Sequence, residues 1–316
     1  MLLAREGRRT EGCPLSSTTV DQTVFLTLVR TAGDRSCARI LIDSIRSFGG
    51  ALSRCPIWLF EANPQHAPCK DLAGPGVQLV PLSAPETVRG YTFADKVYAC
   101  ARAEELTTPK VRSLVWFDPV CLVIRSPLLF DLAQSSSGAA VRPVHIKNVG
   151  LIATEPLDGF WGRVYEAVGV RDIETTVETF VDGTRIRSYY NSHAFAVDPS
   201  ERLLRRWFEC FESLVSDQAF QTSCCQDELH RVFLHQALLS ALLATSLGPN
   251  RIRVLPPEYN YPYNLHRSVA TDRRAGSLND LVCITYEDRS IDPSVVDDID
   301  IYDPLRSWLS ARATAW

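Results

Sequence analysis

The feature that most restricts the fold is a regular alternation of apolar runs and amphipathic stretches over residues 21–134. Short apolar runs bounded by turn residues predict strands, and apolar side chains three and four positions apart predict helices. Strands are predicted at 23–30, 57–61, 77–80, 113–117 and 121–124, and helices at 33–48 and 93–106. This order is typical of an α/β fold with a doubly wound, mostly parallel sheet and helices on both faces.

The rest of the chain has a less regular pattern. Strands are predicted at 139–143, before 197 and at 281–286, and helices at 157–168, from Pro199 onward, at 226–245 and near Trp308. Neither a repeat nor a low-complexity segment interrupts the sequence. We therefore expect one compact domain of two abutting halves, preceded by a flexible tail at residues 1–20.

Composition excludes several classes of protein. The formal net charge is -4, which argues against nucleic acid as a partner, because phosphate binding requires excess basic charge. Apolar runs are too short for a membrane span. The first twenty residues lack the apolar core of a signal peptide, so we expect a cytoplasmic protein whose ten cysteines are reduced. The single methionine fits a high-G+C bacterial origin.

Motif searches exclude other enzymes. The chain contains no GxGxxG after its first strand, no GxxxxGK[ST] and no GxSxG, which argues against a nicotinamide cofactor, a P-loop and a nucleophile elbow. Asp118 follows the predicted strand at 113–117, and ligands bind at the carboxyl ends of parallel strands. Asp118 is therefore a candidate catalytic residue, although an Asp in this position is often only a turn residue.

Four segments, in order, resemble motifs of the GT-A fold glycosyltransferases, especially the glycogenin-like and galactosyltransferase-like families. Residues 115–123 (VWFDPVCLV) resemble the strand that ends in Asp-x-Asp, and 190–197 (YNSHAFAV) the Asn-Ser-Gly segment. Residues 235–241 (HQALLSA) resemble the Asp-Gln helix start, and 255–261 (LPPEYNY) a Pro-rich loop. Lys96 lies on a helix similar to one before the Asp-x-Asp strand. The resemblance covers about residues 22–266.

The resemblance implies a GT-A-like fold and transfer of a sugar from a nucleotide-activated donor to a small-molecule or peptide acceptor. Residues 21–134 would form a Rossmann-like nucleotide-binding half, and 139–316 the acceptor-binding half with the C-terminal tail. The resemblance implies that Thr27 to Val29 line the pocket for the base, that Lys96 contacts the donor, and that Asp118 binds the metal or the ribose. It also implies that Asn191 and Ser192 form hydrogen bonds with the transferred sugar and that Gln236 orients this sugar.

The resemblance also implies a divalent cation, manganese or magnesium, but the sequence departs from the family's metal-binding motif. The second carboxylate of Asp-x-Asp is Val120 here, and hard cations need several oxygen ligands. Imidazoles stand where the family has Gly and Asp, and we predict Asp118, His193, His235 and His266 as metal ligands, with His145 also nearby. Such a set also suits iron, copper or zinc. Each histidine alone is more often a packing residue.

Two further functions stay open on the sequence alone. The replaced carboxylate and the added imidazoles are compatible with a metal-dependent, non-glycosyl reaction on a recruited GT-A-like fold. They are also compatible with an inactive relative that only binds a partner. In the transferase, we expect a single cation or a set of cationic side chains to stabilise the leaving diphosphate, and Lys147, Arg187 and Arg267 are the candidates.

Overall fold

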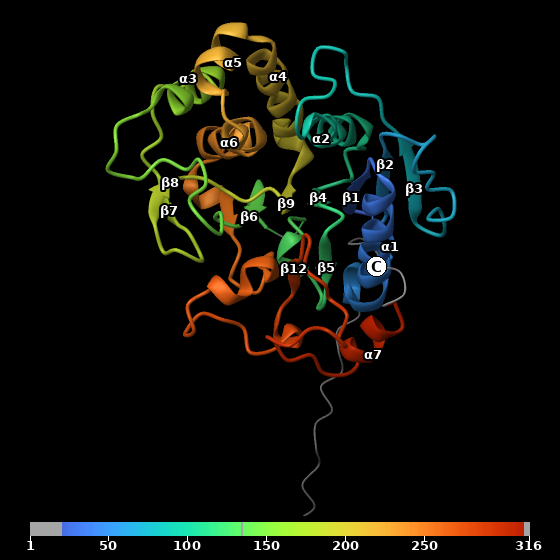
Figure 1. Ribbon diagram of the computed structural model, residues 1–316. Coiled ribbons are helices and arrows are strands. Elements are labelled where there is room, and N and C mark those ends of the chain that lie inside the picture. Colours follow the sequence, from blue (N-terminus) through green and yellow to red (C-terminus); the bar gives the residue numbers. More distant parts are fainter. Residues whose placement is uncertain (1–20, 134, 313–316) are drawn as a thin grey trace, which may run out of the picture.

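The computed structural model describes residues 21–133 and 135–312, and the predicted tail at 1–20 lies outside them. A seven-stranded sheet of order β10-β6-β9-β4-β1-β2-β3 forms its centre (Figure 1). The strands are β1 Thr23–Val29, β2 Ile57–Glu61, β3 Val77–Pro81, β4 Ser113–Phe117, β6 Ala139–Val141, β9 Ala194–Val197 and β10 Ile252–Val254. Neighbouring strands are parallel except beside β9, which is antiparallel to β4 and β6. The predicted mostly parallel α/β sheet is confirmed.

Helices and two small sheets complete the fold. The helices are α1 Ala32–Phe48, α2 Ala94–Leu106, α3 Gly159–Ala167, α4 Leu203–Ser216, α5 Gln218–Cys224, α6 Glu228–Ser246 and α7 Leu305–Ser310. A three-stranded sheet joins β11 Tyr261–Pro262, β12 Cys283–Thr285 and β5 Cys121–Val123. A hairpin pairs β7 Thr176–Glu178 with β8 Arg185–Arg187.

The central sheet separates two apolar cores. In Figure 1, α2 to α6 lie on one side of the sheet and α1 lies on the other. Strand β4 is buried on both faces, as its unbroken apolar sequence requires. Its Leu114 and Trp116 pack under α2, α4 and α6, whereas Val115 and Phe117 pack toward α1. A third apolar cluster lies between β5, β12 and the C-terminal segment.

One predicted helix start is wrong by four residues. Pro199 begins a short 3-10 turn capped by the Asp198 side chain, and Arg202 then adopts a left-handed conformation with φ 54°. This conformation breaks the helix, so α4 starts at Leu203. The pattern also missed α5, the β7–β8 hairpin and β10, which are all short elements.

Residues 21–133 and 135–312 contain neither a membrane-spanning helix nor a disulfide bond. No helix there is long and apolar enough to cross a membrane. The nine cysteines described in these ranges are all free thiols, and Cys13 lies outside them.

Candidate functional site

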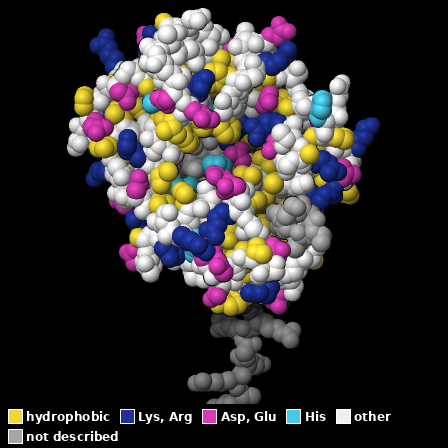
Figure 2. Space-filling model, viewed as in Figure 1, with side chains coloured by type: hydrophobic (Ala, Val, Ile, Leu, Met, Phe, Trp, Pro, Cys, Tyr) yellow, Lys and Arg dark blue, Asp and Glu magenta, His cyan; other side chains and the backbone are white. Residues whose placement is uncertain are grey.

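A cavity of about 350 Å³ opens at the carboxyl ends of β1 and β4. Figure 2 shows a hollow near the middle of the face in view, where histidine and acidic side chains meet. The lining residues of the cavity come from β1, α1, α2, β4, α6 and the loops beside them: Leu28, Arg30, Asp34, Phe93, Lys96, Trp116, Asp118, Pro119, Val120, Ser192, His193, Val232, Phe233, His235, Gln236 and Glu287. Ligand sites in open α/β sheets occupy this position.

The antiparallel strand β9 explains why distant segments meet in this cavity. Phe117 at the end of β4 pairs with Ala194 at the start of β9. The residues before β9 therefore lie beside the residues after β4, and the backbone N–H of Asp118 donates to the carbonyl of His193 (2.8 Å). Sequence order alone did not indicate this contact.

A buried ion pair occupies the floor of the cavity. Lys96 Nζ lies 2.9 Å from both carboxylate oxygens of Asp118, and Trp116 Nε1 donates to Oδ1 of that carboxylate at 2.7 Å. Lys96 also donates to the carbonyl and hydroxyl oxygens of Ser192, at 2.7 and 3.3 Å. Lys96 is 2% exposed, so its three N–H groups are satisfied by protein atoms. The ion pair fixes the position of the Asp118 carboxylate.

Helix α6 supplies a neutral hydrogen-bonding wall. Gln236 Oε1 accepts from the backbone N–H of Ser192 at 3.0 Å and lies 3.1 Å from the hydroxyl oxygen of the same residue. His235 Nδ1 lies 2.8 Å from the Val232 carbonyl, which only accepts, so Nδ1 carries the proton. His235 Nε2 is then free to accept from Ser192 (3.0 Å). Burial, and secondly the Lys96 charge, lowers the pKa of His235 well below its ordinary value, which keeps the ring neutral.

A relay of amide side chains fixes the orientation of His193. Asn191 Oδ1 accepts from the backbone N–H of His193 (2.8 Å) and from Asn260 Nδ2 (2.8 Å), so it is an oxygen acceptor. His193 Nδ1 lies 3.0 Å from the same oxygen. Thr285 in turn donates to Asn260 at 2.5 Å. Asn191 is absent from the cavity lining and orients His193 from behind.

Glu287 is a site residue that sequence reasoning missed. His193 Nε2 lies 3.3 Å from Glu287 Oε1 and 3.9 Å from Asp118 Oδ2. The hydrogen bond from His193 lowers the pKa of Glu287 and so favours its charged form. Glu287 follows β12, just as Asp118 follows β4, so an acidic residue after a predicted strand was the available signal.

The four predicted metal ligands do not gather in one place. Both ring nitrogens of His235 are bound to protein groups. His266 lies in another region, with Nδ1 2.8 Å from the Tyr261 hydroxyl and Nε2 3.0 Å from the Asp298 carbonyl. Within residues 21–133 and 135–312, no group of three His, Cys, Asp or Glu has a spacing that suits a metal ion. The donor set therefore does not fit the divalent cation that the fold family implies.

The predicted base pocket also needs correction. Side chains alternate along a strand, and only Leu28 of the segment from Thr27 to Val29 lines the cavity. Val29 belongs to the core under α1, and Thr27 is 1% exposed. Arg30, one residue beyond the predicted segment, does reach the cavity.

The three predicted phosphate-binding cations lie away from the cavity and have other partners. Lys147 donates to the Gly150 carbonyl at 3.2 Å. Arg187 pairs with Asp172, and Arg267 with Asp297 and Asp298.

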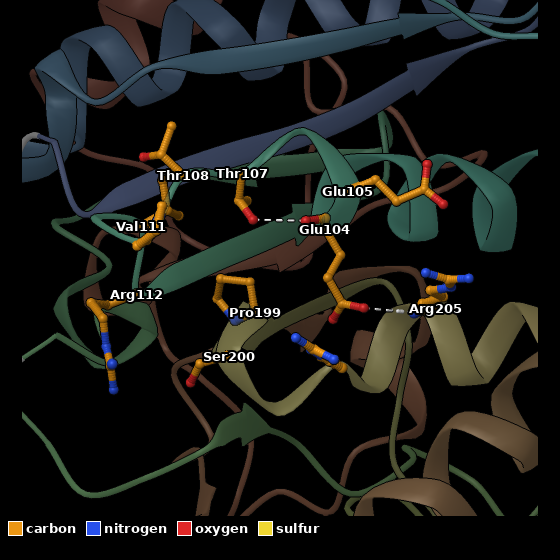
Figure 3. A pocket seen from close by; sticks show the side chains of 11 residues that line it. Glu104, Glu105, Thr107, Thr108, Val111, Arg112, Pro199, Ser200 and Arg205 are labelled. Atoms are coloured by element: carbon orange, nitrogen blue, oxygen red, sulfur yellow. Dashed lines mark hydrogen bonds between the residues drawn. The ribbon is translucent and has the colours of Figure 1, made fainter.

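A larger hollow of about 650 Å³ lies where α2 ends and α4 begins (Figure 3). Its charged groups hold these helices together: Glu104 accepts from the backbone N–H groups of Leu204 (3.1 Å) and Arg205 (2.9 Å). Arg112 pairs with Asp198 at 2.6 Å. Because these groups have structural partners, we place the functional site in the smaller cavity.

Comparisons with known proteins identify the fold and the family of the chain. No curated protein matches the chain. Among solved structures, the galactosyltransferase LgtC in complex with donor and acceptor sugar analogues is 12% identical, with a TM-score of 0.51 over 92% of this chain and 95% of that one. An active-site mutant of LgtC is 11% identical, with a TM-score of 0.53 and the same coverage. These likenesses confirm the predicted GT-A-like fold.

The family described as the Rhodobacterales glycosyltransferase domain matches residues 36–247, which is more than half of the chain. The match runs from within α1 to the end of α6 and therefore contains Lys96, Asp118, Ser192 and Gln236. The predicted glycosyltransferase assignment is confirmed, and the chain belongs to the Rhodobacterales glycosyltransferase domain family.

Proposed function

We propose that the cavity beside Asp118 binds a nucleotide-activated sugar and that the protein transfers this sugar to a small-molecule or peptide acceptor. The LgtC structure is a complex with donor and acceptor sugar analogues, which supports a site in this protein that binds a donor and an acceptor together. The cavity has a suitable volume for part of a donor and lies at the carboxyl ends of the sheet. The predicted cytoplasmic location stays a prediction.

The observation that carries this proposal is the convergence of separate motifs on one carboxylate. Lys96 from α2, Asp118 after β4, Ser192 before β9 and Gln236 on α6 form one hydrogen-bonded network. Ordered polar groups of this kind stabilise developing charge without reorganising during the reaction. Packing alone does not require so many polar groups beside a cavity, because each one costs desolvation energy.

Each residue of the network has a proposed role. Asp118 accepts a hydroxyl hydrogen of the donor, because Lys96 and Trp116 hold its carboxylate in place and part of it faces the cavity. Ser192 and Gln236 form the wall that orients the transferred sugar. Lys96 acts as a positioning residue. Asn191 is also a positioning residue, because it orients the His193 ring.

No observation favours the two other functions that the sequence left open. The metal-dependent, non-glycosyl reaction depended on imidazoles that share a site, and His235 and His266 are held apart by their own partners. The hypothesis of an inactive relative depended on the missing carboxylate at Val120, but the carboxylate of Asp118 is still present in the cavity.

The proposal is tested by turnover of a panel of nucleotide-activated sugars, with release of nucleoside diphosphate as the readout. Wild-type protein should release nucleoside diphosphate from at least one donor. Asp118→Asn should lower this rate by about 100-fold or more, because a preorganised polar group in an active site typically contributes that much. Thermal melting checks that the variant is folded.

The matched control is Asp71→Asn, which makes the same chemical change in a surface pair with Arg35 and Arg39. Its turnover should equal that of the wild type. Undiminished turnover in folded Asp118→Asn, or no release from any donor by the wild type, contradicts the proposed function.

A further inference from the structure

We infer that this protein binds the diphosphate of its donor without a divalent cation, and that Arg30 supplies the positive charge. The inference rests on the proposed function and extends it to the chemistry of the leaving group. It starts from the disagreement between the donor set of the cavity and the cation that the fold family implies.

The first observation is that protein groups already occupy Asp118. One ammonium and one indole N–H contact its carboxylate, at 2.9 and 2.7 Å. A divalent cation on Asp118 would lie beside the buried charge of Lys96, whose ammonium group is held in place by Asp118 and Ser192. Like charges repel strongly where water is excluded. Lys96 therefore balances the charge of Asp118 and leaves little affinity for a second cation.

The second observation is the shortage of further ligands. Val120 lines the cavity with an apolar side chain at the position of the second carboxylate. The two other carboxylates that line the cavity already have partners: Glu287 lies 3.3 Å from His193, and Asp34 lies 3.0 Å from Arg30. Magnesium at a phosphate substrate usually has one or two carboxylate ligands, and waters and phosphate oxygens complete its coordination. Here each carboxylate of the lining is already paired with a Lys, Arg or His side chain.

The third observation is the placement of Arg30. Among the described residues that line the cavity, Arg30 and Lys96 are the Lys and Arg side chains, and Lys96 is buried. Arg30 follows β1 directly, and its side chain is 42% exposed. It is thus the lining cation that a ligand can reach.

Asp34 holds Arg30 in a geometry that suits a diphosphate. Arg30 Nε donates to Asp34 Oδ2 at 3.0 Å, and the backbone N–H of Arg30 donates to the same oxygen at 3.0 Å. Nη2 is 3.5 Å from Oδ1, which is the outer limit of a hydrogen bond. The outer edge of the guanidinium is therefore available, and a planar guanidinium binds phosphate oxygens in pairs.

The test is isothermal titration of the full chain with uridine, adenosine, guanosine, cytidine and thymidine diphosphates, each in excess EDTA and in excess manganese. The affinity for the preferred nucleotide should differ by less than about 2-fold between the two conditions. Arg30→Gln should weaken binding by about 10-fold in both, because it removes a charge-assisted hydrogen bond.

Arg35→Gln is the matched control, since Arg35 lies close by in the sequence, in the first turns of α1, but pairs with Asp71. Its affinity should equal that of the wild type. Binding that needs manganese, or that is unchanged in Arg30→Gln, overturns the inference and leaves the proposed function intact. Absence of binding by every nucleotide in both conditions overturns the two together.

Discussion

At the scale of single residues, the ion pair between Lys96 and Asp118 has structural as well as chemical importance. Removing one member of a buried pair leaves the other charge without compensation. We expect Lys96→Met to lower the free energy of unfolding by about 3 kcal/mol in urea denaturation, at the low end of the usual range because Asp118 borders the cavity.

The double variant Lys96→Met with Asp118→Asn is the control for this prediction. It should be more stable than the sum of the two single effects implies, because no lone charge remains. Effects that add within about 0.5 kcal/mol would mean that the two side chains do not interact.

His145 gives a prediction for pH dependence. Its ring is buried, and neither nitrogen has a partner among the described residues. Burial, and secondly Arg142, lowers the pKa of His145 well below its ordinary value of 6.5. Below pH 6.5 the His145 ring is protonated in the unfolded chain but still neutral in the folded protein. The free energy of unfolding therefore decreases as the pH falls.

We expect His145→Leu to remove about 2 kcal/mol of the stability loss between about pH 7 and pH 5, measured by urea denaturation at each pH. Loss of polar atoms that lack partners should not itself destabilise the protein. An unchanged pH dependence in His145→Leu would show that other groups cause the loss.

Strand ends explain which site residues the sequence revealed. Asp118 was predicted because it directly follows a buried strand, and Lys96, Ser192 and Gln236 through the family resemblance. The structure brings all four together. His266 was misplaced, because no local pattern indicates that Tyr261 and Asp298 hold its ring.

At the scale of secondary-structure elements, α4 depends on a residue of another helix. The left-handed conformation of Arg202 ends the preceding turn just before α4. The Glu104 side chain of α2 then accepts hydrogen bonds from the first backbone N–H groups of α4 (Figure 3). We expect Glu104→Ala to lower the free energy of unfolding by about 1–2 kcal/mol, as for the loss of an N-cap.

The neighbouring Glu105→Ala is the control, because Glu105 pairs only with Arg102 on the surface of the same helix. It should change stability by less than about 0.5 kcal/mol in the same denaturation experiment. Equal losses in the two variants would contradict the capping role of Glu104.

Element length decided what the pattern predicted. Strands β1 to β4 and helices α1 and α2 have five or more residues, and each contains a clear apolar run or an apolar face, so their predicted positions were accurate. Strands β7, β8 and β10 have three residues each and include charged side chains. Helix α5 buries only Phe220, so it has no apolar face to detect.

At the scale of the whole molecule, the site is a product of topology. Strands β6, β9 and β10 come from the second half of the sequence but belong to the same sheet as β1 to β4. The alternating pattern predicted a parallel sheet, yet it contained no signal for the antiparallel insertion of β9. That insertion brings Ser192 beside Asp118 and creates the cavity.

The most direct measurement is a crystal structure of the protein with the nucleoside diphosphate that binds most tightly. The account predicts the diphosphate at the carboxyl ends of β1 and β4, against Arg30 and next to Asp118, with no metal ion between the phosphates and Asp118. A nucleotide in the larger hollow beside Glu104 would contradict the assignment of the site, and a metal ion bridging Asp118 and the diphosphate would contradict the role of Arg30.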